Sequence, residues 1–337
     1  MKEKPLKSKT ISQSVASVVI VSGLTLTGCT SGGSGEAGSN YPSGPINISA
    51  PAEPGSGWDT TARAMTQVLE EENLVDVPVP VQNQPGGIGC SWLTEMVNNH
   101  AGETDQLAIA SLANQTVKAR SLCEYGPDDV TMIASLFVED FVTVSRAESD
   151  IDSVDALVGA LKEDPAGVAI AASGDDQLPF ALFAEAAGID PTDLNFVTYE
   201  GGGEQTNALL NGDATVAIAG VSEFRGVLES GDLQAIMTFS EEPLEAPLDS
   251  VPTAVESGYD VALGNWRGVY GPADMPEEAV TFWQETLAEM VETEGWQTQV
   301  ENNQWTELFQ TGDELSTYID KASQTVTEGV KKTQIGN

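Results

Sequence analysis

The chain has 337 residues, and its 52 Asp and Glu against 14 Lys and Arg give a formal net charge of −38. A surface of this charge repels nucleic acids and anionic lipid headgroups, so we expect no nucleic-acid partner. Two interpretations stay open: a protein of a high-salt habitat, where screening makes self-repulsion tolerable, or simply an acidic protein that works outside the cytoplasm.

The N-terminus resembles a lipoprotein signal peptide over residues 1–28. Four lysines precede an apolar run at 15–26, which is too short and too rich in Ser and Thr for a membrane span. The sequence Leu26-Thr27-Gly28-Cys29 then resembles the lipobox of prokaryotic lipoproteins. We therefore expect lipidation at Cys29 and an extracytoplasmic protein anchored to the cell membrane. The alternative is a secretory signal in which this cysteine occurs by chance.

A Gly/Ser-rich segment, 29–43, follows and is expected to be a flexible tether. The next stretch, 46–70, predicts a strand, a Gly/Pro loop and an amphipathic helix with Asp59 or Thr60 as its N-cap. The first turn of such a helix has unpaired N–H groups and a partial positive charge, so it could bind a carboxylate or a phosphate without Lys. An ordinary strand-to-helix turn is the other interpretation.

Four more units repeat this pattern of a strand, a polar loop and a helix. The predicted strands are 77–81, 106–110, 168–172 and 194–199, and the helices after them are 92–98, 114–122, 179–187 and 204–210. Such alternation predicts an α/β fold with mixed, mostly parallel sheets flanked by helices, and ligands at the carboxyl ends of the strands.

Two apolar segments, 130–146 and 233–239, are predicted to cross between two lobes. Lobe 1 would then comprise 44–140 and 240–337, and lobe 2 would comprise 141–239. A hinge of two crossing strands would let the lobes close on a ligand. Helices predicted at 277–291 and 311–333 are expected to pack on lobe 1.

Catalytic, metal and cofactor sites find little support in the sequence. His100, the only histidine, stands at a predicted helix C-terminus. Gly87-Ile88-Gly89 begins a dinucleotide fingerprint, but Trp92 occupies the third glycine position. The acid pairs 128–129 and 175–176 lack the alternating spacing of a calcium loop. We therefore expect no cofactor, no metal and no enzymatic step.

Cys90 and Cys123 follow a Gly-rich loop and a predicted helix. In an oxidising compartment they could form a disulfide, and two separate thiols are the alternative.

From Tyr41 onward, the chain resembles a substrate-binding protein of the tripartite tricarboxylate transporter family (the Bug family). The segments that carry the resemblance are APAEPGSGWDTTAR (50–63), VQNQPGGIG (81–89), YEGG (199–202) and WRGVYGP (266–272). The resemblance implies a monomeric, two-lobed periplasmic-binding-protein fold of type II, the Venus flytrap. Such receptors deliver a small carboxylate to a membrane permease that has a large and a small subunit.

In the family, two facing loops hold the ligand carboxylate through backbone N–H groups, small hydroxyls and bridging waters. The resemblance therefore implies a set of ligand-binding residues in these loops: Gly55, Ser56, Gly57, Trp58, Asp59, Thr60, Ser173, Gly174, Asp175, Gln177, Gly201 and Gly202. We add Ser111, which stands at the end of another predicted strand. The Gly-Trp-Asp form resembles the tricarboxylate-binding branch of the family more than the amino-acid-binding branches. Receptors for an acidic amino acid or an aromatic acid, and a sensory binding module, are the alternatives.

Two departures from the family pattern concern charge and bulk. Ser56 interrupts a run that is often glycine, and Asp175 with Asp176 brings negative charge to a proposed anion site. Either these acids point outward, or the ligand carries a cation. Three arginines could offset the charge of these acids: Arg63, Arg225 and Arg267. Each could instead form a surface ion pair, and we favour that alternative for Arg225.

Overall fold

The computed structural model describes residues 41–335. The predicted signal peptide, the lipidation site Cys29 and most of the tether lie outside these residues.

The described strands form a mixed sheet that is continuous through one long strand, β4 (Thr131–Arg146). The strand order is β2-β1-β3-β9-β4-β7-β5-β6, and β8 and β10 also pair with β4. The other strands are β1 (Asn47–Ala50), β2 (Val81–Asn83), β3 (Gln106–Ser111), β5 (Ala169–Ala172), β6 (Asn195–Thr198), β7 (Val216–Gly220), β8 (Leu233–Thr238), β9 (Gly264–Gly271) and β10 (Thr306–Gln310).

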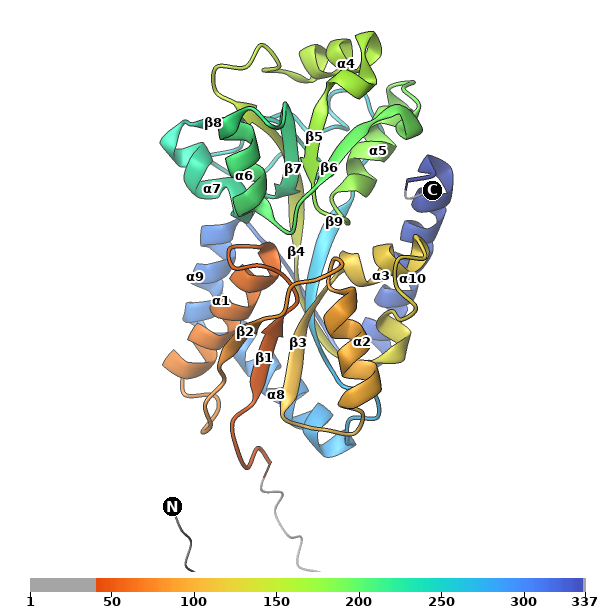
Figure 1. Ribbon diagram of the computed structural model, residues 1–337. Coiled ribbons are helices and arrows are strands. Elements are labelled where there is room, and N and C mark those ends of the chain that lie inside the picture. Colours follow the sequence, from red (N-terminus) through yellow and green to blue (C-terminus); the bar gives the residue numbers. More distant parts are fainter. Residues whose placement is uncertain (1–40, 336–337) are drawn as a thin grey trace, which may run out of the picture. The chain divides into compact units, whose positions relative to one another are not determined.

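Strand β4 belongs to two sheets along its length (Figure 1). Residues 131–140 pair with β9 and, in part, with β10, and together with β1, β2 and β3 they form what we call the first sheet. Residues 141–146 pair antiparallel with β7 and β8, and with β5 and β6 they form the second sheet. The result is the two-lobed α/β fold that the sequence predicted.

Helices flank both sheets. Those beside the first sheet are α1 (Gly57–Glu71), α2 (Cys90–Asn99), α3 (Leu112–Ala119), α8 (Glu277–Val291) and α9 (Glu294–Asn303). Those beside the second sheet are α4 (Val154–Glu163), α5 (Gln177–Ala186), α6 (Gly202–Asn211) and α7 (Val221–Ser230). Short 3₁₀ turns occur at Pro127–Asp129, Pro165–Gly167 and Pro191–Asp193.

The last helix, α10 (Gly312–Thr333), contacts α3 and α5. It therefore touches helices of both lobes, whereas the sequence placed it on lobe 1. Among the residues described, no helix is both long enough and apolar enough to cross a membrane.

Apolar periodicity explains how the elements that carry the site are held. Strand β3 is buried from Leu107 to Ser111, as expected for a strand covered on both faces. On α1, Met65, Val68 and Leu69 are buried at helical spacing and anchor the helix on the first sheet. The N-terminus of α1 is thereby fixed at the carboxyl end of β1.

Two expectations from the sequence need correction. The strand expected at 77–81 begins only at Val81, because Pro78 and Pro80 have no N–H to donate; their carbonyls accept hydrogen bonds from Ile46 and Ile48. The segment 233–239 was expected to cross between lobes, but β8 pairs with β4 inside the second sheet. The chain returns to the first sheet at Gly264, where β9 begins beside Asp140.

Candidate functional site

A pocket lies between the loops of the first sheet and those of the second. Its empty space is about 350 Å³, including the opening to solvent. It is lined by Ser56, Gly57, Trp58, Ile88, Ser173, Asp175, Asp176, Tyr199, Glu200, Gly201, Glu223 and Arg267. Most of these residues follow the carboxyl ends of parallel strands, which is where ligands bind in α/β folds.

The loops of the two lobes touch at this pocket. A Cβ atom built on Gly174 would lie 2.2 Å from Cδ1 of Ile88, and one on Gly201 would lie 2.9 Å from Cβ of Ser56. Such contacts across the pocket leave no room for a side chain at either glycine. The loops of the two lobes therefore approach each other closely at these two glycines.

Helix α1 begins one residue after Ser56, which is its N-cap. The Ser56 hydroxyl accepts a hydrogen bond from the Asp59 N–H at 3.3 Å. The sequence had placed the N-cap at Asp59 or Thr60, three or four residues too late. Because Asp59 lies in the first turn, its carboxylate instead accepts the Gly55 N–H at 2.9 Å and closes the loop.

The Asp59 carboxylate points away from the pocket. It is 4% exposed, and it accepts hydrogen bonds from Arg63 Nε and Asn83 Nδ2 at 2.9 Å each. Burial raises the pKa of Asp59, but hydrogen bonds from Arg63, Gly55 and Asn83 outweigh it and hold that pKa below its ordinary value. Asp59 and Arg63 thus fix the loop that carries Ser56 and Gly57.

Two N–H groups at the start of α1 have no acceptor among the described residues. They belong to Gly57 and Trp58, since the N–H groups of Ser56 and Asp59 bond to Glu53 and to the cap. Both residues line the pocket. A helix N-terminus with free N–H groups attracts anions, so the start of α1 remains the candidate anion cradle of the sequence analysis.

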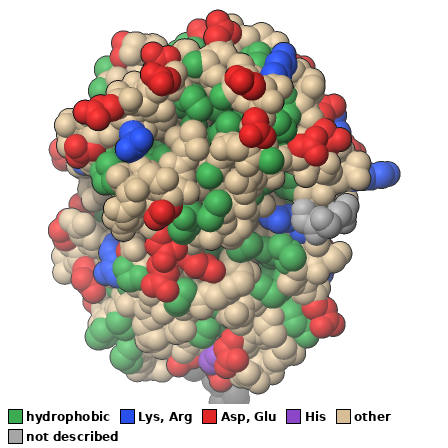
Figure 2. Space-filling model, turned by 45° about the horizontal axis from the view of Figure 1, so that its top comes forward, with side chains coloured by type: hydrophobic (Ala, Val, Ile, Leu, Met, Phe, Trp, Pro, Cys, Tyr) green, Lys and Arg blue, Asp and Glu red, His purple; other side chains and the backbone are tan. Residues whose placement is uncertain are grey.

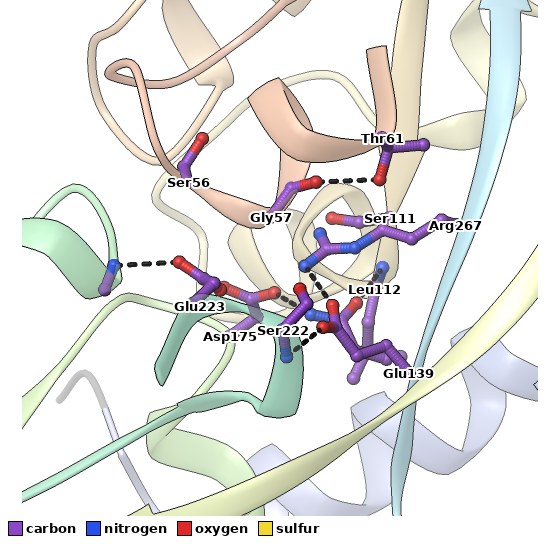
Figure 3. A network of polar contacts seen from close by, with 12 residues as sticks. Ser56, Gly57, Thr61, Ser111, Leu112, Glu139, Asp175, Ser222, Glu223 and Arg267 are labelled. Carbon is purple, nitrogen blue, oxygen red and sulfur yellow. Dashed lines mark hydrogen bonds and ion pairs between the residues drawn. The ribbon is translucent and has the colours of Figure 1, made fainter. Parts of the chain in front are cut away.

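Arg267, on β9, brings a buried positive charge to the same place (Figure 3). Its side chain is 4% exposed and its Nη2 lies 3.4 Å from Oε2 of Glu139, whose side chain is 1% exposed. A Cβ on Gly57 would lie 2.2 Å from Nη2 of Arg267, so the guanidinium rests directly against α1. The second carboxylate oxygen of Glu139 accepts the Ser222 N–H at the start of α7.

The second lobe contributes several carboxylates to the pocket. Oε2 of Glu223 accepts the Gly202 N–H at 2.8 Å, and Oδ2 of Asp176 accepts the Ser173 N–H at 2.8 Å. Burial, followed by the charge of Glu139, raises the pKa of Glu223 to about 7. Burial and the neighbouring carboxylates also raise the pKa of Asp176 well above its ordinary value.

The structure brings about half of the sequence-predicted ligand residues to the pocket. Those that line it are Ser56, Gly57, Trp58, Ser173, Asp175 and Gly201. Those that do not line it are Gly55, Asp59, Thr60, Ser111, Gly174, Gln177 and Gly202. Most of the latter shape the loops: Ser111 caps α3, for instance, and Gln177 donates to Thr198.

The sequence missed two buried acids, Glu139 and Glu223. It had named Arg267 among three cations, and the structure distinguishes the three. Arg267 reaches the pocket, whereas Arg63 pairs with Asp59 and Arg225 forms an exposed ion pair with Glu229. The pair at Arg225 is the alternative that the sequence favoured.

Cys90 and Cys123 form a disulfide, the first of the two alternatives. It joins the start of α2 to the segment after α3, next to the loop that carries Ile88. Among the described residues, no group of three or more His, Cys, Asp or Glu is arranged to hold a metal ion.

A pocket between two lobes, with crossing strands that connect them, defines a periplasmic-binding-protein fold of type II. A family model described as the tripartite tricarboxylate transporter family receptor matches residues 62–333, and the chain belongs to this family. Protein BugT of Bordetella pertussis is 28% identical over 243 residues, which cover 69% of this chain and 72% of BugT.

Solved structures share the fold. MatC from Rhodopseudomonas palustris, solved with bound malate, has a TM-score of 0.74 at 19% identity and covers 88% of this chain and 100% of its own. R. palustris Rpa4515, solved with adipate, has a TM-score of 0.80 at 17% identity, and the match covers 87% of this chain and 98% of Rpa4515.

Proposed function

We propose that this protein is a lipid-anchored extracytoplasmic receptor that binds a small di- or tricarboxylate between its lobes and delivers it to a tripartite tricarboxylate permease. One observation carries the proposal: the N–H groups of Gly57 and Trp58 and the buried guanidinium of Arg267 converge on one pocket. A carboxylate there would gain charge-assisted hydrogen bonds from a buried cation and from a helix N-terminus.

The relatives support this choice of ligand. Two structural neighbours were solved with malate and with adipate, which are both dicarboxylates. The family is one of transport receptors, and none of the groups that line the pocket forms a nucleophile and base pair. We therefore propose binding and release, with no chemical step.

A thermal-shift screen of the purified protein in about 2 M salt tests the proposal. Di- and tricarboxylates, amino acids, sugars and phosphates are compared as ligands. A ligand at a hundred times its Kd should raise the free energy of unfolding by about 2.7 kcal/mol, which is an easily measured shift in Tm. A shift with a sugar or a phosphate, and with no carboxylate, would contradict the proposal.

A matched pair of variants locates the site. Gly57→Ala places a methyl group where Arg267 lies, so we expect the ligand-induced shift to be lost. Gly203→Ala is the control, because a Cβ there has open space and the residue lies outside the pocket. Equal ligand shifts in both variants would place the ligand elsewhere.

The membrane anchor is tested separately. We expect the protein to sediment with membranes and Cys29→Ser to release it, since that substitution removes the proposed site of lipid attachment. Deletion of the receptor should abolish cellular uptake of the carboxylate found in the screen, while uptake that continues unchanged would argue for a sensory module.

A further inference from the structure

One oxygen of the Glu223 carboxylate is held in place and the other is open. Oε2 accepts the Gly202 N–H at the start of α6, at 2.8 Å. Oε1 accepts no hydrogen bond from any of residues 41–335, and Glu223 lines the pocket. A carboxylate oxygen is an acceptor, so Oε1 needs a hydrogen that either a ligand or a bound proton must supply.

This open oxygen lies at the candidate anion cradle. Glu223 belongs to α7, in the second lobe, but a Cβ atom built on Gly57 would lie 3.2 Å from its Oε1 (Figure 3). The same Cβ would lie 2.2 Å from Nη2 of Arg267. A ligand carboxylate on the N–H groups of Gly57 and Trp58 would therefore have two neighbours, one cationic and one acidic.

The charges around the pocket do not balance an added anion. Arg267 is the only Lys or Arg among the residues that line the pocket, and its guanidinium already pairs with the buried Glu139 at 3.4 Å. Its Nε has no hydrogen-bond partner within residues 41–335, so it can still hold one carboxylate group. Four carboxylates line the same pocket: Asp175, Asp176, Glu200 and Glu223. A ligand carboxylate would add one more negative charge to this group.

Two carboxylates in contact do not both stay ionised in such a place. Like charges about 3 Å apart repel each other strongly, and one of the two groups keeps its proton well above the ordinary carboxyl pKa. The protonated group then donates a short hydrogen bond to the ionised one. A proton between Glu223 and a ligand carboxylate would thus fill the open position at Oε1 and remove one negative charge.

The surroundings of Glu223 favour that proton. Burial, followed by the charge of Glu139 on β4, raises the pKa of Glu223 to about 7. The acid in the first turn of α1, Asp59, does not line the pocket and pairs with Arg63. The charged groups that line the pocket or act on Glu223 are Glu139, Asp175, Asp176, Glu200 and Arg267. Because all but one are acids, a ligand anion beside Glu223 raises its pKa further.

We propose that a ligand carboxylate binds at the α1 N-terminus beside Glu223 and that the two groups share one proton, which is taken up from solvent on binding. The proton is held on Oε1 of Glu223 and donated to a carboxylate oxygen of the ligand. No other bond forms or breaks, and the proton returns to solvent when the ligand leaves. This inference rests on the proposed carboxylate receptor and makes Glu223 the residue that admits a carboxylate only together with a proton.

Calorimetric titration in buffers of different ionisation enthalpy counts the protons. The probes are succinate, glutarate, malate and tricarballylate, titrated into the purified protein at about pH 8, where ordinary carboxyl groups are ionised. EDTA is present throughout, and one series contains magnesium chloride instead. The slope of binding enthalpy against buffer ionisation enthalpy is the number of protons taken up. We expect a slope close to one proton per bound ligand.

The affinity should follow the same proton. The pKa of Glu223 is about 7 without ligand and higher in the complex, so binding is strongest below this value and weakens as pH rises through it. We expect Kd to rise about tenfold or more from about pH 7 to about pH 8.5. Asp140, whose pKa burial and Glu139 raise to about 6, is largely ionised throughout this window.

Glu223→Gln supplies the hydrogen without a proton. Its amide oxygen can accept the Gly202 N–H while its NH₂ group donates to the ligand at every pH. We expect proton uptake to fall to near zero and Kd at about pH 8.5 to be about tenfold or more lower than in the wild type. Glu163→Gln, an exposed acid on α4 outside the pocket, should behave as the wild type does. If Glu223→Gln does not fold, the proton count of the wild type decides.

The outcomes distinguish this inference from the proposed function. If none of the probes binds at any pH, the receptor function itself is wrong. If they bind without proton uptake and with an affinity that does not change with pH, the function stands and the shared proton is wrong. Proton uptake that persists in Glu223→Gln would overturn the assignment to Glu223, because another acid would hold the proton. Binding that requires magnesium would also overturn it, since a metal ion would then balance the charge.

Discussion

Arg267 and Glu139 form a buried ion pair that joins β9 to β4, the two strands that pair with each other up to the junction of the lobes. The two side chains are 4% and 1% exposed, and a Cβ on Gly220 would lie 2.4 Å from the Glu139 carboxylate carbon. The pair therefore lies where the lobes meet, and Arg267 lines the candidate pocket, so we expect the pair to affect both stability and binding.

We expect Arg267→Met to lower the free energy of unfolding by about 3 kcal/mol, because it leaves the Glu139 charge buried without a partner. Carboxylate binding should also be lost. Adding Glu139→Gln to this variant removes the stranded charge and should restore more than half of the stability without restoring binding. Urea unfolding and ligand titration measure both effects, and a single variant as stable as the wild type would refute the role of the pair.

Asp59 provides the complementary case, a residue of the Gly-Trp-Asp motif that shapes the loop without lining the pocket. Asp59→Ala removes the acceptor of the Gly55, Arg63 and Asn83 donors and should cost about 2 kcal/mol of stability. Ligand preference between two carboxylates should stay the same, even if affinity weakens as the loop loosens. A selective loss of one ligand at unchanged Tm would make Asp59 a direct ligand contact.

Strong local patterns in the sequence predicted the fold well. Alternating apolar strands, Gly-rich loops and amphipathic helices yield the parallel units, and helix α8 begins and ends where its spacing indicates. Helix α9 and the β7–α7 unit were not predicted. The strand predicted at 77–81 was wrong in its bounds. Its apolar residues alternate as in a strand, but Pro78 and Pro80 have no N–H groups to donate to a neighbouring strand.

The site was only partly predictable, because its charges come from distant segments. Glu139 lies in an apolar stretch that predicts a crossing strand, and its partner Arg267 is 128 residues further on. Glu223 is one of 52 acids in a chain whose surface is strongly acidic, as Figure 2 shows for one face. Nothing local marks it as buried, and only the close approach of α7 to α1 and α6 gives it a role.

The Cys90–Cys123 disulfide should stabilise the lobe that carries Ile88. It links residues 33 apart in sequence, and the loop-entropy relation predicts a contribution of about 3 to 4 kcal/mol. We expect a reducing agent to lower the Tm of the wild type by several degrees. The double variant Cys90→Ala with Cys123→Ala should melt at the lower temperature in both conditions. Equal melting of the wild type with and without reductant would show that the bond does not stabilise the folded protein.

Stability should depend on pH through Glu223. In the folded protein, burial and the charge of Glu139 raise the pKa of Glu223 to about 7. The charge of Asp175 also raises this pKa, whereas Arg267 and the Gly202 N–H lower it. In the unfolded chain the pKa returns to its ordinary value of 4.5. The folded protein then binds more protons between these two values, so the free energy of unfolding of the ligand-free protein falls as pH rises through this window.

We expect the ligand-free protein to be more stable at pH 5 than at pH 8, with Glu223 contributing on the order of 1 to 3 kcal/mol to the difference. High salt in all samples screens the general repulsion among surface acids, which acts in the same direction. Glu223→Gln should flatten the dependence by removing the titrating group, while Glu163→Gln, at an exposed position on α4 outside the pocket, should leave it as it is. Parallel curves for the wild type and Glu223→Gln would mean that Glu223 is not the group that titrates.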